Sequence, residues 1–157
     1  MNIKNKYLII KSESNFPEVP FQDSKYPMYS SFLFLIPSLY SLYYKEYFYS
    51  YLLLSNTIIS INYWKKCKKG FWRTLDLYSS KISFIIFLHL SLSNIIKFKY
   101  IINIILRLLN IFFFYNNSNI LFYNNNSLWK YNHIIFHFFV SIEVYLTLQK
   151  YIIIKYS

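Results

Sequence analysis

Five long hydrophobic segments alternate with short polar stretches along this chain, and this alternation is its dominant pattern. The segments cover residues 27–44, 47–64, 74–96, 98–115 and 129–154. The first two have no charged residue over 18 positions each. A helix of about 20 apolar residues is long enough to cross the ~30 Å hydrocarbon core of a bilayer. The pattern therefore predicts an all-α fold, a polytopic transmembrane bundle of about five helices, with four or six helices as the alternatives.

The polar stretches suggest the domain organisation. Residues 1–26 form a polar N-terminal segment without the apolar core of a signal peptide, and residues 27–157 form the transmembrane helical domain. The Asn-rich stretch 116–127 interrupts the apolar pattern and predicts a loop, with room for a short re-entrant piece at 120–123. Pro37 lies inside the first segment and predicts a kink there, because proline has no N–H to donate.

The composition fits a membrane and excludes several kinds of site. Hydrophobic residues make up 55% of the chain and charged residues 15%, whereas soluble domains have about 25% charged residues. Gly70 is the only glycine, which excludes glycine-rich nucleotide loops, and the single Cys67 excludes an intrachain disulfide or a multi-cysteine zinc cluster. Because alanine is absent as well, we expect loose helix packing in which serine and aromatic contacts replace Gly and Ala.

The net charge is +11, and five of the 17 Lys and Arg residues lie in the basic loop 65–73. With five spans, the side holding this loop and the N-terminus has ten Lys and Arg residues against five on the other side, so it is predicted to be cytoplasmic, most simply in an endomembrane. The loop either binds anionic lipid headgroups or acts only as a topology signal, and Cys67 within it is a candidate for palmitoylation. Nucleic acid is not an expected partner, because the charge lies on a short loop.

Arg107 and Glu143 are ionisable residues inside hydrophobic segments, where charges are costly and are usually paired. Each lies about 10 Å from the same membrane face on adjacent antiparallel segments. Equal depth predicts that they touch, which would lessen the desolvation cost of both. We interpret them as a structural intramembrane pair rather than a proton relay, because no further carboxylate continues a path.

His133 and His137 form a second group with Ser60 and Asp76. The two histidines are four residues apart, so both imidazoles lie on one helix face, a spacing that suits a shared metal ion or hydrogen bonds to neighbouring helices. Ser60 ends the second segment and Asp76 begins the third, and in a five-helix topology both lie on the side where the histidines begin the fifth. A hydroxyl, a carboxylate and two imidazoles are therefore expected at one level.

These residues resemble the signature of the CREST superfamily, which includes alkaline ceramidases, progestin/adiponectin-type receptors and myomaker-like proteins. The resemblance covers about half of the chain, in the stretches Ser60–Trp64, Phe71–Ser83 and Asn132–His137. Its members have seven membrane helices, and those that are enzymes hydrolyse lipid amide or ester bonds with zinc. By resemblance, His133 and His137 would bind zinc. Asp76 would orient or deprotonate a zinc-bound water, and Ser60 would support it.

The chain departs from the signature at Trp64, which stands where the family has a histidine and cannot bind zinc. Asp76 then either completes a site of two histidines and one aspartate, or the residues hydrogen-bond without metal. His89 is excluded as a ligand, because it follows Asp76 by ~20 Å along a straight helix.

Two functions are therefore expected. The first is a zinc-dependent membrane lipid hydrolase, active or degenerate, with membrane lipids as its partners. The alternative is a non-enzymatic membrane subunit or lipid-interacting protein that has no metal site. An A/T-biased, poorly folded reading frame is a third possibility. The oligomeric state is left open by the sequence.

Overall fold

The computed structural model describes residues 19–93 and 98–157, the side chains of 98–100 excepted, and these residues are helical apart from short turns. No strand occurs in the described ranges. The elements are α2 Phe21–Ser30, η2 Ser31–Phe34, α3 Leu35–Tyr43, α4 Tyr47–Lys65, α5 Phe71–Ser93, α6 Phe98–Tyr123 and α7 Trp129–Tyr156. The all-α prediction is correct for this part of the chain.

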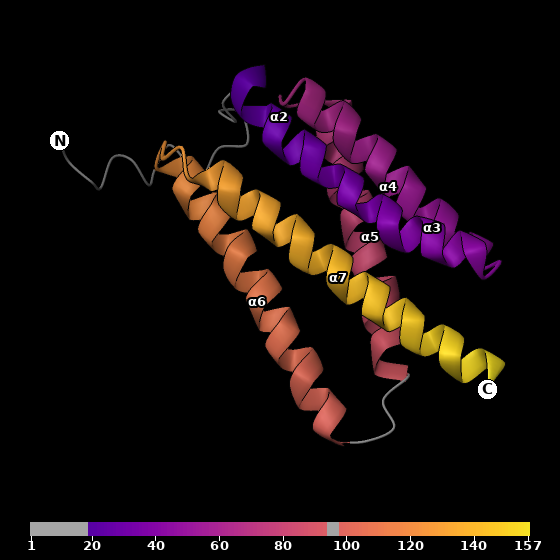
Figure 1. The fold of residues 1–157 in the computed structure, drawn as a ribbon. Coiled ribbons are helices and arrows are strands. Elements are labelled where there is room, and N and C mark those ends of the chain that lie inside the picture. Colours follow the sequence, from indigo (N-terminus) through magenta and orange to yellow (C-terminus); the bar gives the residue numbers. More distant parts are fainter. Residues whose placement is uncertain (1–18, 94–97) are drawn as a thin grey trace.

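The segments α2, η2 and α3 form one rod (Figure 1). Pro37 lies in the first turn of α3, just after η2. Proline cannot donate to the carbonyl four residues earlier, and its ring clashes with that carbonyl. The break expected at Pro37 therefore takes the form of the 3₁₀ turn η2. The carbonyl of Leu33, four residues before Pro37, accepts a hydrogen bond from Ser141 Oγ of α7 at 2.8 Å in addition to one from a backbone N–H at the end of η2. The turn therefore contacts α7.

Short turns with positive φ angles end two of the helices. Lys45 (φ 62°) follows α3, and Asn125 (φ 53°) follows α6. At the second turn, Asn126 N–H donates to the Leu121 carbonyl at 2.9 Å and Asn125 N–H to the Phe122 carbonyl at 3.0 Å, which is the bonding of a Schellman cap. The only glycine, Gly70, has φ 149° and accepts from the first turn of α5.

The helix α7 is the centre of the bundle. It packs against α6, α5 and the α2–α3 rod, whereas α4 packs against that rod and α5. Figure 1 shows α6 and α7 as a pair joined at one end, with α2, α3 and α4 on the other side of α7. The ends of α4 and α6 and the starts of α2, α5 and α7 therefore lie at one end of the bundle, which we call the histidine end. The other end is called the arginine end.

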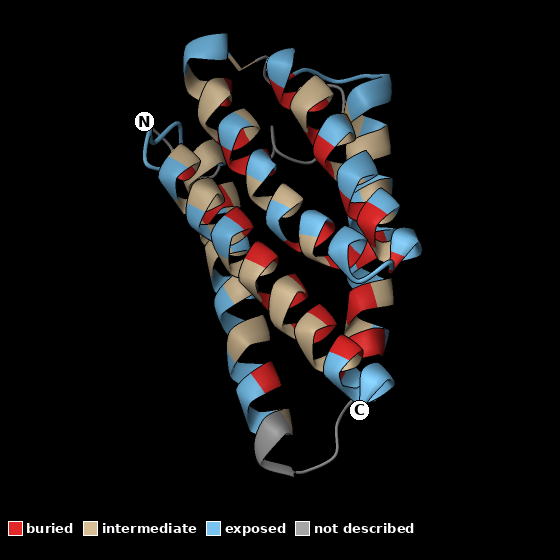
Figure 2. Ribbon diagram, turned by 45° about the vertical axis from the view of Figure 1, so that its right-hand side comes forward, coloured by how far each residue is buried: buried red, intermediate tan, exposed pale blue. Residues whose placement is uncertain are grey.

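Small hydroxyl residues, more than large apolar ones, occupy the helix contacts. Eleven serines are buried in the described ranges, as many as the buried hydrophobic residues other than proline, so the expected replacement of Gly and Ala by Ser is present. The pale-blue parts of the ribbon in Figure 2 mark where exposed residues lie along the helices. Large apolar side chains are exposed on every helix. They include Phe32, Leu39, Phe48, Ile85, Phe112 and Ile153. This is the reverse of the distribution in a soluble domain.

The Asn-rich stretch 116–127 differs from its prediction, because α6 continues through it to Tyr123 and the turn covers only the residues up to Leu128. Contacts with α7 explain the difference. Asn117 Nδ2 donates to Asn132 Oδ1 at 2.9 Å, and Ser118 Oγ donates to the Trp129 carbonyl at 3.1 Å. Tertiary contacts therefore override the weak helix propensity of asparagine here. The re-entrant piece expected at 120–123 is the last turn of α6.

Within the described residues, two helices are long and apolar enough to cross a membrane by length and composition alone. They are Phe71–Ser93 and the part of α6 from Ile101 to Tyr123. In both, few residues are buried inside the protein, so their apolar surfaces face outward.

Candidate functional site

The candidate site is built around the first turns of α7. His133 and His137 lie one turn apart, and their ring centroids are 4.6 Å from each other. His137 is buried at 5% exposure and His133 is half-buried. Ser30 of α2 contacts His137, and Ser118 of α6 contacts His133. The imidazole pair therefore fills the space between three helices at the histidine end.

The hydrogen bonds of the two serines fix the orientation of both rings. Ser30 Oγ donates its one hydrogen to the Pro27 carbonyl at 2.9 Å, so at 2.8 Å it accepts from His137 Nδ1. Ser118 Oγ likewise donates to the Trp129 carbonyl, and it lies 3.4 Å from His133 Nδ1. With Nδ1 protonated in each ring, Nε2 has the free lone pair. Hydrogen bonds to the distal nitrogen orient metal-binding histidines in the same way.

Trp64 lies where the CREST-like pattern would place a third histidine. Its indole packs edge-on against His133 at 4.8 Å between centroids and stacks with Trp129 at 6.1 Å. Trp64 is buried at 8% exposure, and its Nε1 has no hydrogen-bond partner among the described residues. The indole is a donor only, so this position contributes bulk and one N–H rather than a metal ligand.

Ser60 and Asp76 also lie at the histidine end. Ser60 Oγ lies 2.9 Å from Ser31 Oγ, which donates to the same Pro27 carbonyl as Ser30 does. Ser60 interacts with the Asp76 side chain and is linked, through Ser31 and the Pro27 carbonyl, to Ser30 and so to His137. Within the described ranges, no three His, Cys, Asp or Glu side chains are grouped as a metal ion requires. Zinc binding therefore stays a prediction that rests on two imidazoles.

Sequence reasoning missed Ser30, Ser31 and Ser118, which are the hydrogen-bond partners of the site. Serine is common in this chain, and neither their spacing from the histidines nor their segment marks them. Ser30 and Ser31 follow Pro27 by three and four residues, and hydroxyls at those positions can bond a carbonyl one turn earlier. This spacing is the one feature of the sequence that points to them.

Arg107 and Glu143 are in contact at the arginine end, forming an ion pair between Nε and Oε2. The Glu143 side chain is 10% exposed and that of Arg107 38%. The second carboxylate oxygen, Oε1, is buried and has no hydrogen-bond partner within the described residues. One carboxylate oxygen of Glu143, Oε2, is therefore paired with a cation, whereas the other, Oε1, has no partner within the described residues.

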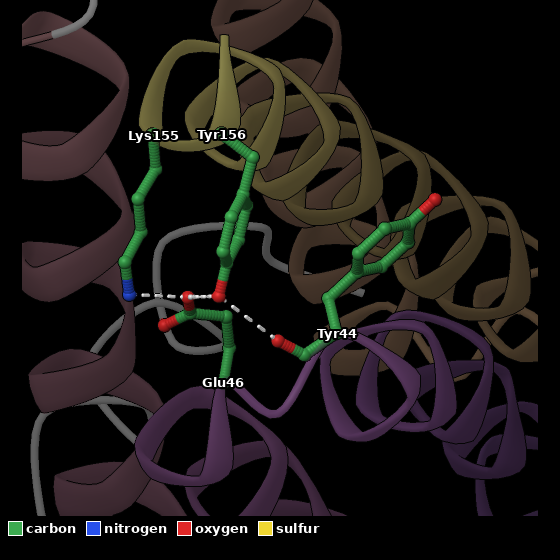
Figure 3. Close-up of polar contacts among 4 residues, drawn as sticks. All are labelled: Tyr44, Glu46, Lys155 and Tyr156. Atoms are coloured by element: carbon green, nitrogen blue, oxygen red, sulfur yellow. Dashed lines mark hydrogen bonds and ion pairs between the residues drawn. The ribbon is translucent and has the colours of Figure 1, made fainter.

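A second ion pair at the same end attaches the last turn of α7 to the α3–α4 turn (Figure 3). Lys155 Nζ lies 2.5 Å from Glu46 Oε1. The Tyr156 hydroxyl lies 3.3 Å from both that oxygen and the Tyr44 carbonyl. The hydrogen bond to Glu46 raises the pKa of Lys155. A comparable pair, Lys130–Asp23 at 2.6 Å, closes the histidine end.

Cys67 is buried at 2% exposure, within a cluster that contains Tyr63, Trp64 and Trp129. Burial raises the pKa of its thiol to about 11. A protonated thiol inside a cluster of aromatic rings is poorly placed for acylation. The lysines beside it, Lys66 and Lys68, are exposed.

Neither a family model, nor a curated protein, nor a solved structure matches this chain. The resemblance to the CREST superfamily therefore rests on the stretches around Ser60, Asp76 and His133 alone.

Proposed function

We propose that this chain is an integral membrane protein with five spans. Its large apolar side chains point outward and its serines inward, which suits a lipid surround. Two helices meet the length and composition of a span. The other three rods lie beside them and connect through turns of three to five described residues or, between α5 and α6, through residues 94–97. Helices joined so closely occupy the same slab of the bilayer.

An odd number of spans places the two termini on opposite sides, with the N-terminus and loop 65–73 in the cytoplasm. The test uses sealed microsomes and a full chain that has an epitope tag at either end. Protease added outside should remove the N-terminal tag and leave the C-terminal tag protected. Equal protection of both tags would contradict five spans.

We further propose that the protein acts without metal catalysis, as a lipid-facing subunit that keeps CREST-like geometry at its histidine end. The observation that supports this is Trp64 packed against His133 in the place of a third ligand. Catalytic zinc sites use three protein ligands and keep one position open. Here two imidazoles are present, and within the described residues no third His, Cys, Asp or Glu joins them in a group that could hold a metal ion. This donor set does not fit catalytic zinc.

In this proposal the site has a structural role. His137 bonds α7 to α2 through Ser30, and His133 bonds α7 to α6 through Ser118. Ser31 and Ser60 continue the same network to α4. The network therefore joins four helices with neutral groups, which avoids the cost of placing charges in the bundle.

A zinc-dependent lipid hydrolase remains the second candidate, because one observation favours it. Both Nε2 atoms have free lone pairs, and no hydrogen bond within the described residues uses either. A zinc ion held by His133 and His137 would supply a Lewis acid and an activated water.

Metal analysis of the purified full chain distinguishes the two candidates. We expect less than one zinc per ten chains, with no difference between the wild type and His133→Ala. The matched control is His89→Ala, which removes an exposed imidazole of α5. One zinc per chain that is lost in His133→Ala and His137→Ala, and kept in His89→Ala, would establish the metal site instead.

A further inference from the structure

A cleft of about 250 Å³ lies at the arginine end, between α5, α6 and α7. It is separate from the histidine site, which lies at the opposite end of α7. Five polar side chains line it together with two apolar ones. The polar ones are Ser91, Asn103, Arg107, Thr147 and Lys150.

Helical spacing brings these residues to one place. Asn103 and Arg107 are one turn apart on α6, and Thr147 and Lys150 are nearly one turn apart on α7. Ser91 lies two residues before the end of α5. Ser91 and Thr147 are buried, whereas Asn103 is exposed, so the cleft has a closed floor and an open side.

The cleft has the charge and the donors of an anion site. Arg107 uses Nε for Glu143, which leaves the two terminal nitrogens of its guanidinium for another acceptor. Lys150 adds a second cation. Glu143 is the partner of Arg107, and the formal charges of Arg107, Lys150 and Glu143 sum to +1. The other polar lining groups are hydroxyls and an amide, which can donate hydrogen bonds.

We propose that this cleft binds a phosphate group, carried by an anionic lipid headgroup or free. Arginine and lysine together with hydroxyl donors match phosphate oxygens. The volume is below the ~300–1,000 Å³ of pockets that enclose whole small molecules, so it suits a headgroup alone. Exposed Ile102, Ile105 and Leu106 continue from the cleft along α6 and offer a surface for acyl chains.

The test measures lipid binding to the purified full chain in neutral detergent by native mass spectrometry. Dioleoyl phosphatidic acid is compared with dioleoyl phosphatidylcholine, and inorganic phosphate is titrated separately. We expect phosphatidic acid to bind more tightly than phosphatidylcholine. Lys150→Gln should raise its Kd about fivefold, as loss of ~1 kcal/mol per basic residue implies. Arg107→Lys should raise the Kd as well, because lysine keeps the pairing with Glu143 but not the two-pronged donor geometry.

Lys45→Gln is the matched control, since Lys45 is exposed at the same end of the bundle and outside the cleft. It should leave the Kd unchanged. Asn103→Ala, which removes an exposed neutral donor, replaces Lys150→Gln if that variant does not fold. Inorganic phosphate that binds as tightly as phosphatidic acid, with the same variant dependence, would identify free phosphate as the ligand. Equal binding of the two lipids, or an equal loss in Lys45→Gln, would overturn the proposal.

Discussion

The two ends of the bundle bury polar groups in different ways. At the histidine end, the interior contains imidazoles and hydroxyls, and each serine that touches a histidine also donates to a backbone carbonyl. At the arginine end, the interior contains carboxylates, and each is paired with a cation that stays partly exposed. Arg107 and Lys155 have side chains that are 38% and 44% exposed, while their acidic partners are about 10% exposed.

This difference follows from the desolvation energies of the groups. A neutral hydroxyl or imidazole can be buried once its hydrogen bonds are made. A carboxylate needs a nearby cation, and a long basic side chain can keep its head near water while it forms the pair. The histidine end should therefore depend on hydrogen-bond geometry and the arginine end on charge balance.

Removing the cation at the arginine end should have the largest effect. Arg107→Met leaves the Glu143 carboxylate buried without compensation and should lower the free energy of unfolding by about 3 kcal/mol. The double variant Arg107→Met/Glu143→Met should recover most of this loss, since no charge is then buried. Unfolding by SDS titration in mixed micelles measures both values.

The Lys130–Asp23 pair provides the control for that experiment. Its Asp23 side chain is 40% exposed, so Lys130→Met, which leaves this carboxylate unpaired, should cost less than about 1 kcal/mol. If Lys130→Met cost as much as Arg107→Met, the burial of the remaining carboxylate would not be what sets the cost of losing its cation.

At the histidine end, Ser30→Ala should cost about 2 kcal/mol, because it leaves the buried His137 Nδ1–H without an acceptor. Ser118→Ala should cost less, about 1 kcal/mol, because its 3.4 Å contact is long and His133 is only half-buried. The same SDS titration compares them.

Ser41→Ala is the matched control for these two substitutions. Ser41 is fully buried, but its hydroxyl bonds only the Pro37 carbonyl of its own helix, so the effect should be the smallest of the three. A Ser41→Ala loss that equals the Ser30→Ala loss would mean that the imidazole contact adds nothing.

The smallest effect concerns Cys67. With a pKa of about 11, the buried thiol should react with iodoacetamide slowly at pH 8, and its rate should keep rising through pH 10. In SDS the rate should level off near pH 9. The neutral thiol also favours the folded state up to about pH 9, and this contribution should disappear as the pH passes 11. Mass spectrometry of the alkylated chain measures the rate.

Much of the helix pattern could be predicted from the sequence. Long uncharged runs, Pro37 and the charged breaks around Lys45 and Lys65 mark the first two rods to within a few residues of their ends, apart from the earlier start at Phe21. The stretch 116–127 was misjudged, because Asn117 and Ser118 are helical only through their bonds to α7. The helix propensity of a segment contains no information about its contacts with a helix that follows later in the sequence.

The candidate site could be predicted in part. The positions of Ser60, Asp76 and the two histidines along their helices imply one common end, and the equal depths of Arg107 and Glu143 imply a pair. The partners Ser30 and Ser118 could not be found from the sequence. A serine that bonds an imidazole and a serine that bonds a carbonyl of its own helix occur in the same sequence patterns.

The sequence by itself predicted about five helices, most of their ends and the relative level of each polar residue along the bundle, because a 1.5 Å rise per residue converts position into distance along a helix. Only the tertiary structure decided which side chain faces which. That choice depends on the rotation of each helix about its axis, which α7 sets for its neighbours through packing at Ser141, Leu148 and His137. The level of a residue along the bundle follows from its own helix alone, whereas a contact between two side chains also depends on how the neighbouring helix is rotated.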